Sequence, residues 1–595
     1  MELKHSYHTL IIGTGCAGYH AAERLWLLGV RDIAILTEGV NCGTSRNTGS
    51  DKQTYYKLSL CGGEGDSVRE MARTLYDGGA VMGETALCEA AYSTRCFMHL
   101  VELGVPFPTN EYGEYAGYKT DHDPRSRATS CGPLTSKYMT EALEKSVSDK
   151  GIPVFDGYPA VKLVVEDNRI RGVVALETQT GKSVTVACRN AILCTGGAPC
   201  VYAHTVYPDS QMGSFGLAID AGAATVNMDQ WQYGIASVGF KWNLSGSYQQ
   251  VLPRYLSVDA EGVEREFLYD ALGNESLGLT FLKGYEWPFD TRKLDGSSQV
   301  DLLVAAEIAK GRRVYLDFTK NPRVWEEATF FALPPEAYWY LQNADCLFGT
   351  PIRRLKKLNP KAVELYASHG IDLSRDRLEI AVCAQHINGG VAVDENWEST
   401  VRGLYAAGEC AGTFGVYRPG GSALNATQVG SLRAAEHIAS QEDRSLPEPL
   451  DFTVTVTSGG TDADQLRTVG DEIRHEMSLF AAFDRDTERM KDLLARVRGY
   501  LEELDEDTVF SHERFTLWNQ LLTTREILSA MICSAEEVGS HGSALVDRHA
   551  PEENPAPRRT RTVTLQGVSE IRPVSPMPDP ELWFETLLAR TKKEE

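Results

Sequence analysis

A glycine-rich segment near the N-terminus has the residue types and spacing of a nucleotide-binding turn. Gly13-Thr14-Gly15-Cys16-Ala17-Gly18 follows an apolar run at residues 8–12 and precedes a helical pattern at 19–29. In such a strand–turn–helix unit, backbone N–H groups and the helix N-terminus can face a pyrophosphate. Glu38 follows, and a carboxylate there accepts hydrogen bonds from a ribose 2′-OH and repels a 2′-phosphate. The pattern predicts an unphosphorylated dinucleotide; the alternative is a structural turn with an exposed glutamate.

A second glycine-rich segment, far along the chain, distinguishes a flavin from a nicotinamide. Residues 400–409 form a strand-like run that ends at Ala407 and is followed by Glu409, whose carboxylate can accept hydrogen bonds from a ribityl chain. Residues 418–424 place two glycines before a helical pattern at 423–438. Backbone donors there can approach a flavin pyrimidine edge, and the helix dipole stabilises negative charge on the reduced ring. The two segments together favour FAD.

The hydrophobic pattern indicates which elements must position these segments. The strand-like runs at 8–12 and 32–36 flank the first helix and form a βαβ unit, and residues 153–195 alternate as a β-meander does. We therefore predict an α/β fold: a discontinuous Rossmann-like FAD-binding domain with an inserted α+β capping domain and a C-terminal helical domain. The predicted bounds are 1–238 and 352–450 for the two parts of the FAD-binding domain, 239–351 for the cap, 451–549 for the helical domain and 550–595 for an extended tail with a short amphipathic helix near 582–589.

Composition excludes several classes of protein. The chain has 595 residues, 42% of them apolar, and a formal charge of −23, so a nucleic-acid partner is disfavoured. The apolar N-terminal stretch is too short to span a bilayer. Thirteen cysteines without a CxxC pair indicate reduced thiols in a cytoplasm rather than disulfides, and no metal site is expected.

The motifs carry a resemblance to a known family. The chain resembles the fumarate reductase/succinate dehydrogenase flavoprotein subunits, with L-aspartate oxidase as another relative, over approximately residues 7–440. The resemblance rests on five ordered motifs, at residues 13–18, 45–50, 191–197, 386–390 and 403–424. It implies FAD beneath a mobile cap, with hydride passing between flavin N5 and a substrate. The candidate FAD contacts are Gly13, Gly15, Cys16, Ala17, Gly18, Glu38, Gly39, Ser45, Asn47, Thr48, Gly49, Ser50, Thr195, Gly196, Gly197, Asp220, Gly408, Glu409, Gly421, Ser422, Ala423 and Leu424.

This chain departs from the family at three places. Residues 42–47 contain no histidine that could bond covalently to the flavin, so we expect noncovalent FAD. Gly234 stands where the family has a substrate-binding histidine, and Ser297 stands where fumarate reductases have a proton-delivering arginine. A serine does not replace a permanently charged donor. Reduction of fumarate itself is therefore disfavoured.

Four residues are candidates for substrate contact. His386 and Arg418 occupy the family positions whose side chains hold a substrate carboxylate, and a guanidinium fork fits a carboxylate well. Arg292 and Arg254 are alternative sources of positive charge, although either is more often a solvated surface arginine. Residues 240–250 mix aromatics with amides and hydroxyls. They can bind a polyhydroxylated or aromatic substrate, or form a hydrophobic seam inside the cap.

We therefore predict a cytoplasmic FAD-dependent oxidoreductase that acts on a small polar substrate, anionic or carbonyl-bearing. An oxidase like L-aspartate oxidase and an electron-transfer subunit docked on an iron–sulfur partner remain alternatives. The direction of the reaction and self-association into a homo-oligomer stay open.

Overall fold

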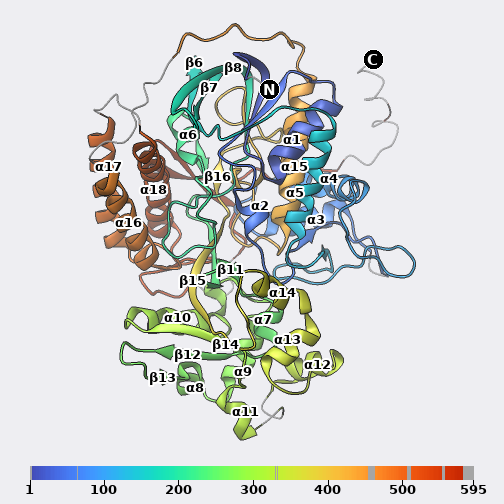
Figure 1. Ribbon diagram of the computed structural model, residues 1–595, viewed down its shortest axis with the longest axis vertical. Helices are drawn as coiled ribbons and strands as arrows, with labels where there is room; N and C mark the ends of the chain where they lie inside the picture. Colours follow the sequence, from blue (N-terminus) through green and yellow to red (C-terminus); the bar gives the residue numbers. More distant parts are fainter. Residues whose placement is uncertain are drawn as a thin grey trace.

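A seven-stranded sheet organises the upper body of the molecule in the computed structural model, which describes residues 3–62, 65–328, 330, 333–452, 463–505, 511–551, 556–580 and 588 (Figure 1). Its strand order is β5-β2-β1-β8-β7-β6, and β17 pairs with β8 beyond the end of β7. The strands are β1 (Ser6–Ile12), β2 (Ile33–Thr37), β5 (Val154–Asp156), β6 (Ala160–Glu166), β7 (Arg169–Glu177), β8 (Lys182–Leu193) and β17 (Leu404–Ala406). Because β17 lies parallel to β8, the two distant glycine-rich segments reach the same edge of this sheet.

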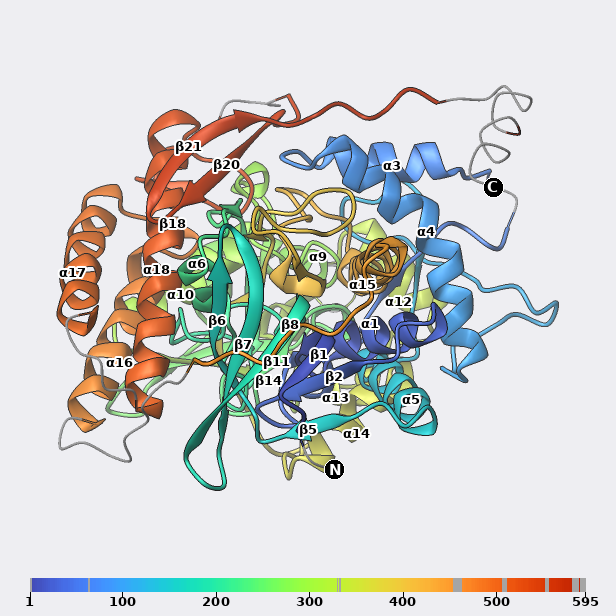
Figure 2. The same cartoon turned by 90° about the horizontal axis from the view of Figure 1, so that it is seen from above.

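The central strands are apolar because helices and loops cover them. β1 and β2 are buried along almost their whole length, as expected for parallel strands inside an α/β layer. The helices of this body are α1 (Cys16–Leu27), α2 (Thr44–Asn47), α3 (Val68–Asp77), α4 (Gly83–Glu102), α5 (Thr135–Asp149), α6 (Phe215–Asp220) and α15 (Ser422–Ser440), with the hairpin β3 (Tyr55–Tyr56) and β4 (Ala128–Thr129). α1 packs against α5 and α15, so the N-termini of α1 and α15 come from one layer (Figure 2).

A second, antiparallel sheet forms the cap, the green and yellow lower body in Figure 1. Its order is β11-β10-β15-β14-β12-β13, with bounds β10 (Trp231–Ser237), β11 (Trp242–Asn243), β12 (Arg254–Val258), β13 (Glu264–Arg265), β14 (Arg313–Asp317) and β15 (Leu378–Ile387). The cap helices are α7 (Ser247–Gln250), α8 (Phe267–Leu272), α9 (Glu275–Leu282), α10 (Ser298–Ala309), α11 (Arg323–Ala328), α12 (Pro335–Asn343), α13 (Pro351–Leu358) and α14 (Pro360–Ser368), with a 3-10 turn η1 (Thr291–Lys293). The sheet reaches past both ends of the predicted insertion at 239–351, because β10 and β15 pair with each other and lead into the upper body.

The C-terminal part adds helices and a hairpin. α16 (Ala463–Phe480), α17 (Thr487–Asp505) and α18 (His512–Glu537) pack together beside the upper body, joined by the short pair β18 (Asp484–Arg485) and β19 (Leu545–Val546). The region predicted as an extended tail contains a hairpin, β20 (Thr560–Leu565) and β21 (Val568–Pro573). β20 pairs with β9 (Thr225–Val226), which also pairs with β16 (Gly390–Val391). The helix predicted near 582–589 lies, except for residue 588, outside the described residues.

The α/β class with a Rossmann-like sheet is thus confirmed. All thirteen cysteines are free thiols. Within the described ranges, no helix combines the length and apolarity needed to cross a bilayer.

Candidate active site

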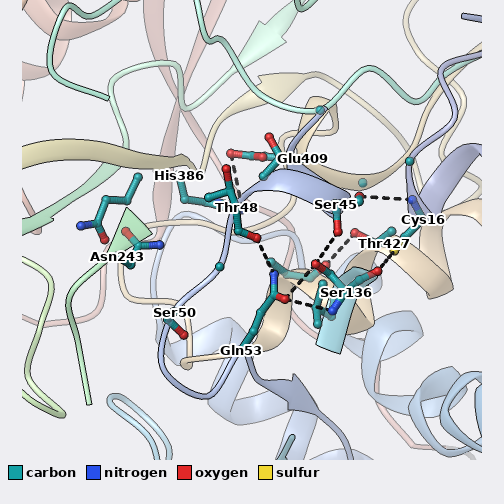
Figure 3. Close-up of a pocket in the computed structure, with 18 of the residues that line it drawn as sticks. Cys16, Ser45, Thr48, Ser50, Gln53, Ser136, Asn243, His386, Glu409 and Thr427 are labelled. Carbon is teal, nitrogen blue, oxygen red and sulfur yellow. Dashed lines mark hydrogen bonds and ion pairs between the residues drawn. The ribbon is translucent and has the colours of Figure 1, made fainter. Parts of the chain in front are cut away.

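A cavity of about 510 Å³ lies between the upper body and the cap. Its walls come from the turn before α1, the loop around α2, the N-terminus of α15 and the cap strands β10, β11 and β15 (Figure 3). Segments as far apart in the sequence as residues 12 and 427 therefore meet in one space.

The turn before α1 can be built only with glycine. Gly13 has φ +109°, and a Cβ there would lie 2.4 Å from the carbonyl oxygen of Cys194. A Cβ at Gly18 would lie 1.9 Å from the carbonyl oxygen of Gly13. No side chain caps the start of α1, although the Cys16 N–H donates to Ser45 Oγ at 3.2 Å. The helix N-terminus therefore presents backbone donors to the cavity, as a pyrophosphate requires.

Glu38 lies at the end of β2 on the cavity wall and accepts a hydrogen bond from the backbone N–H of Met212 at 3.0 Å. Burial raises the pKa of this carboxyl to about 7. A buried carboxylate with acceptor positions to spare fits the hydroxyl donors of a ribose.

Glu409 lies in the 3-10 turn η3 (Gly408–Cys410) that follows β17. It accepts hydrogen bonds from the Tyr207 hydroxyl and from the backbone N–H of Ile387, the latter at 3.1 Å. Burial raises the pKa of Glu409 to about 7. The same wall contains the start of α15, where Gly421 adopts φ +90° and no side chain caps the helix. An acceptor and the uncapped N-terminus of α15 thus line the same cavity as Glu38.

The structure brings most of the predicted FAD contacts together. Those that line the cavity are Gly13, Gly15, Cys16, Ala17, Glu38, Gly39, Ser45, Thr48, Gly49, Ser50, Thr195, Gly196, Gly408, Glu409, Gly421, Ala423 and Leu424. Gly18, Asn47, Gly197 and Ser422 belong to the same segments but do not line it. Asp220 lies outside the cavity, because α6 packs on β6 and leaves its carboxylate 3.4 Å from Lys162 Nζ near solvent.

Arg418 and His386 flank Phe414 on the cavity wall. Each is 8% exposed. The Arg418 Nη1 donates weakly to Ser422 Oγ at 3.5 Å, its Nε has no partner, and burial lowers its pKa to about 10. His386 Nδ1 lies 3.0 Å from Asn388 Oδ1, its Nε2 has no hydrogen-bond partner and lies 3.8 Å from Glu409 Oε1, and burial lowers the pKa of the imidazole well below its usual range.

A buried guanidinium without a bonded carboxylate has polar capacity that only a ligand can use. Among the described residues, no carboxylate forms an ion pair with Arg418. With the neutral imidazole of His386 beside it, this pair suits a carboxylate or carbonyl group.

The other two predicted arginines lie elsewhere. Arg254 belongs to β12 and pairs with Asp317 at 2.8 Å and with Glu266 at 3.5 Å, so its charge is neutralised inside the cap. Arg292 stacks on the Tyr417 ring at 3.5 Å and pairs with Asp290 at 2.7 Å. It lines a separate outer hollow of about 650 Å³ instead of the cavity.

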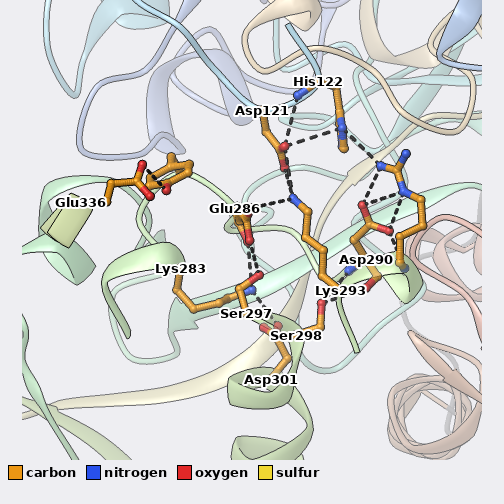
Figure 4. A network of polar contacts seen from close by, with 12 residues as sticks. Asp121, His122, Lys283, Glu286, Asp290, Lys293, Ser297, Ser298, Asp301 and Glu336 are labelled. Carbon is orange, nitrogen blue, oxygen red and sulfur yellow. Dashed lines mark hydrogen bonds and ion pairs between the residues drawn. The ribbon is translucent and has the colours of Figure 1, made fainter. Parts of the chain in front are cut away.

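The two departures predicted at Gly234 and Ser297 have a structural basis. A Cβ at Gly234 would lie 2.8 Å from a ring carbon of Trp287 and 3.1 Å from Gln385 Nε2, so these side chains occupy the space a larger residue would need. Ser297 is fully buried, and its hydroxyl donates to Glu286 at 2.8 Å (Figure 4). Glu286 in turn lies 3.7 Å from Lys293, which contacts Asp121 at 3.2 Å across to the upper body.

Loop contacts hold the cap against the upper body. Asp51 accepts hydrogen bonds from the N–H and hydroxyl of Ser247, at 2.7 and 2.8 Å. The Asn243 N–H donates to the carbonyl of Gly49 at 3.2 Å. Gly246 has no room for a Cβ, which would lie 2.1 Å from Asp51.

Sequence reasoning missed several residues of the wall. Gln232 and Gln385 line the cavity from β10 and β15, and His122 lines both the cavity and the outer hollow. The signal for Gln232 was its spacing of two from Gly234 on one strand, which puts both on the same face. His122 lies in a loop at φ +60°, and no local pattern places that loop.

The wall chemistry fits FAD. Acceptors at Glu38 and Glu409 and helix N–H donors at Gly15 and Gly421 match the ribose, ribityl, pyrophosphate and flavin edges in turn. These residues would hold the cofactor.

Comparisons with known proteins agree with this fit. The family described as "FAD binding domain" matches residues 8–424. The chain is 25% identical over 556 residues to a subunit of the fumarate reductase (CoM/CoB) of Methanothermobacter marburgensis, covering 89% of this chain and 93% of that protein. It is 23% identical over 555 residues to L-aspartate oxidase of Vibrio cholerae, covering 89% and 92%.

Solved structures share the fold. Sdh1 of Mycobacterium smegmatis, in complex with UQ1, superposes with a TM-score of 0.70 at 19% identity, covering 99% of this chain and 97% of that one. A point mutant of FrdA from the E. coli quinol fumarate reductase gives a TM-score of 0.69 at 18% identity, covering 97% of each chain.

Proposed function

We propose, for a chain that belongs to the FAD binding domain family and is an FAD-dependent oxidoreductase related to fumarate reductase and L-aspartate oxidase flavoproteins, a hydride exchange with a small polar substrate. Arg418 and His386 would anchor that substrate. Bound FAD supplies a two-electron acceptor or donor at flavin N5. A saturated substrate gives up a hydride and a proton, and an activated C=C takes up both.

The unpaired guanidinium of Arg418 is the single observation that carries this proposal. Its Nε lacks a hydrogen-bond partner in a buried site, and burial disfavours the charged guanidinium more than the nearby Glu409 and Glu89 favour it, so that its pKa falls to about 10. A carboxylate or carbonyl ligand would remove that cost while the wall excludes water around it. His386, whose Nε2 is also unpartnered, would donate or accept a hydrogen bond beside it.

Fumarate itself is a poor candidate. Trp287 and Gln385 fill the space beside Gly234, where the resemblance places a second carboxylate anchor. Ser297 is committed to Glu286 and carries no charge that could deliver a proton. Arg292 is paired with Asp290 outside the cavity, so it does not replace the charged proton donor that is missing at Ser297.

We propose that FAD is bound noncovalently, because residues 42–50 on the cavity wall contain no histidine. Heating or acid treatment should therefore release all of the yellow colour into the supernatant. Colour that stays with the precipitated chain would contradict this.

Two alternatives follow from the named relatives. An oxidase would return electrons to oxygen, which hydrogen peroxide formed during aerobic turnover would reveal. One relative is named as one subunit of its enzyme, so an electron-transfer partner, iron–sulfur or other, is the second alternative, and co-purification from the native host tests it. A cytoplasmic location is proposed because all thirteen cysteines are thiols.

The test of the main proposal is anaerobic photoreduction of the bound flavin, followed by a screen of enoates, keto acids and keto sugars for reoxidation. Arg418→Met should bind FAD but lose reoxidation by the compound that works best with the wild type. Arg353→Met, an exposed arginine on α13, is the matched control and should behave as the wild type does. If no compound exchanges electrons with the flavin, the proposed function fails.

A further inference from the structure

The cap side of the cavity is uncharged. Its polar side chains are mainly amides, contributed by Gln232, Asn243, Gln250 and Gln385. The aromatic residues of 240–250 turn inward instead: Phe240 stacks on Trp242 at 5.4 Å, and Trp242 is 2% exposed. Residues 240–250 thus pack their aromatic side chains inside the cap and present polar side chains to the cavity.

Three of these amides have buried oxygens with no hydrogen-bond partner: Gln232 Oε1, Asn243 Oδ1 and Gln385 Oε1. Gln232 and Gln385 are each 6% exposed. The Gln385 amide nitrogen lies 3.5 Å from the carbonyl of Ile235, which orients the oxygen away from that carbonyl. Buried polar atoms are nearly always paired. Three such acceptors on one cavity wall indicate a ligand that donates hydrogen bonds.

Register places Gln232 beside His386, at a point where the pairing of β10 and β15 is irregular. Gln232 pairs with His386 across β10 and β15, so its side chain is next to the histidine that flanks Phe414. On the same face, Trp287 and Gln385 close the space beside Gly234.

Two lysines of the cap are already neutralised. Lys283 pairs with Asp301 at 2.7 Å inside the cap, and Lys293 pairs with Asp121 (Figure 4). A second carboxylate here would be buried without a counter-charge, which costs far more than burying a hydroxyl that is hydrogen-bonded. The charged groups Lys52 and Lys119 line the cavity from the upper body.

We infer that the amide wall formed by Gln232 and Gln385 is a hydroxyl-binding subsite, so that the substrate carries one carboxylate or carbonyl at Arg418 and uncharged hydroxyl groups on its remainder, not a second carboxylate. This inference rests on the proposed function for the position of the anchored end. A hydroxyl suits an amide because it donates to the amide oxygen and accepts from the amide nitrogen.

The experiment compares three trans-enoates that share one skeleton: crotonate, 4-hydroxycrotonate and fumarate. They differ only in the group at the fourth carbon, which is a methyl, a hydroxymethyl or a carboxylate. Binding to the oxidised holoenzyme is measured from the change in the visible flavin spectrum. The hydroxy compound should bind about tenfold more tightly than crotonate for one or two buried hydrogen bonds, and fumarate should bind more weakly than the hydroxy compound.

Substitutions at Gln385 and Gln232 test whether their amides bind the hydroxyl group. Gln385→Met and Gln232→Met keep the side-chain volume and remove the amide, so each should reduce the preference for 4-hydroxycrotonate over crotonate to about twofold or less. Gln342→Met, an exposed glutamine on α12, should retain it. Fumarate binding as tightly as the hydroxy compound, no binding by the hydroxy compound, or a preference that survives both substitutions would overturn the inference.

Binding and turnover separate the two claims. If 4-hydroxycrotonate binds with the expected preference but reoxidises no photoreduced flavin, and no other compound does, the proposed function fails and the subsite stands. If compounds turn over without any preference for hydroxyl groups, the subsite falls and the proposed function stands.

Discussion

Replacing Arg418 with methionine should stabilise the apoprotein while removing its activity. Burial lowers the pKa of this guanidinium to about 10, and each tenfold weakening of proton binding corresponds to about 1.4 kcal/mol. The buried charge therefore costs the ligand-free fold about 3 kcal/mol at neutral pH. Because the folded-state pKa is lowered below the ordinary arginine value, this cost is present in full below pH 10. Methionine fills a similar volume without the charge.

Activity should move in the opposite direction. Two charge-assisted hydrogen bonds to a substrate carboxylate, each worth roughly 1.5–3 kcal/mol, correspond to a loss of about 10²- to 10⁴-fold in kcat/KM. FAD content should stay normal, because Arg418 is not itself one of the predicted FAD contacts and its hydrogen bond to Ser422 Oγ, in the neighbouring segment of such contacts, is a long one of 3.5 Å.

The assay is a thermal scan of apoprotein at neutral pH, with and without an added carboxylate ligand, together with turnover of the best substrate from the screen. The ligand should raise the midpoint of the wild type and leave that of the variant unchanged. A variant with a lower midpoint than the wild type would refute the view that the guanidinium lacks a partner. Near-normal turnover would remove Arg418 from the site.

Three further outcomes are expected. Gly18→Ala should abolish FAD binding, because its Cβ would lie 1.9 Å from the carbonyl oxygen of Gly13. The control Gly499→Ala, which has open space on α17, should leave the amount of flavin extracted per chain unchanged. Normal flavin content in Gly18→Ala would contradict the turn geometry. Burial raises the pKa of Glu38 to about 7. The apoprotein should therefore lose stability as pH rises from the ordinary carboxyl range through 7, because Glu38 ionises at lower pH in the unfolded chain than in the folded one. Glu38→Gln should reduce this loss in thermal scans across pH, and parallel curves for the two proteins would contradict the prediction. Ser247→Ala removes one of the two donors that Ser247 offers to buried Asp51, which should lower the free energy of unfolding by about 1–3 kcal/mol. Hydrogen exchange in α7 should become faster. Unchanged exchange there would show that this contact does not hold the cap.

The local sequence was sufficient to predict the structure wherever a short segment determines its own backbone conformation. The turn at residues 13–18 needs glycine for steric reasons that neighbouring atoms enforce, and the apolar runs of β1 and β2 can be satisfied only inside a covered sheet. The predicted family and FAD followed from these motifs and from their order along the chain, and the family match confirms both.

Other features depend on pairing between distant segments. Whether Arg254 or Arg418 faces the cavity depends on which acids the fold brings to each, and Asp317 reaches Arg254 only because β12 pairs with β14. The hairpin β20–β21 replaces the expected extended tail because β20 finds a partner in β9, more than three hundred residues away.

The amino-acid sequence by itself determined the nucleotide-binding turn and the sheet class, because these depend on steric and hydrophobic rules that act over short distances, and it indicated the cofactor through the order of its motifs. Tertiary structure alone decided that Gln232 lies beside His386, that Trp287 fills the space at Gly234 and that Arg418 Nε is left without a hydrogen-bond partner among the described residues. Burial and the pairing of charges belong to the folded chain as a whole, and the chemistry of the substrate wall follows from them.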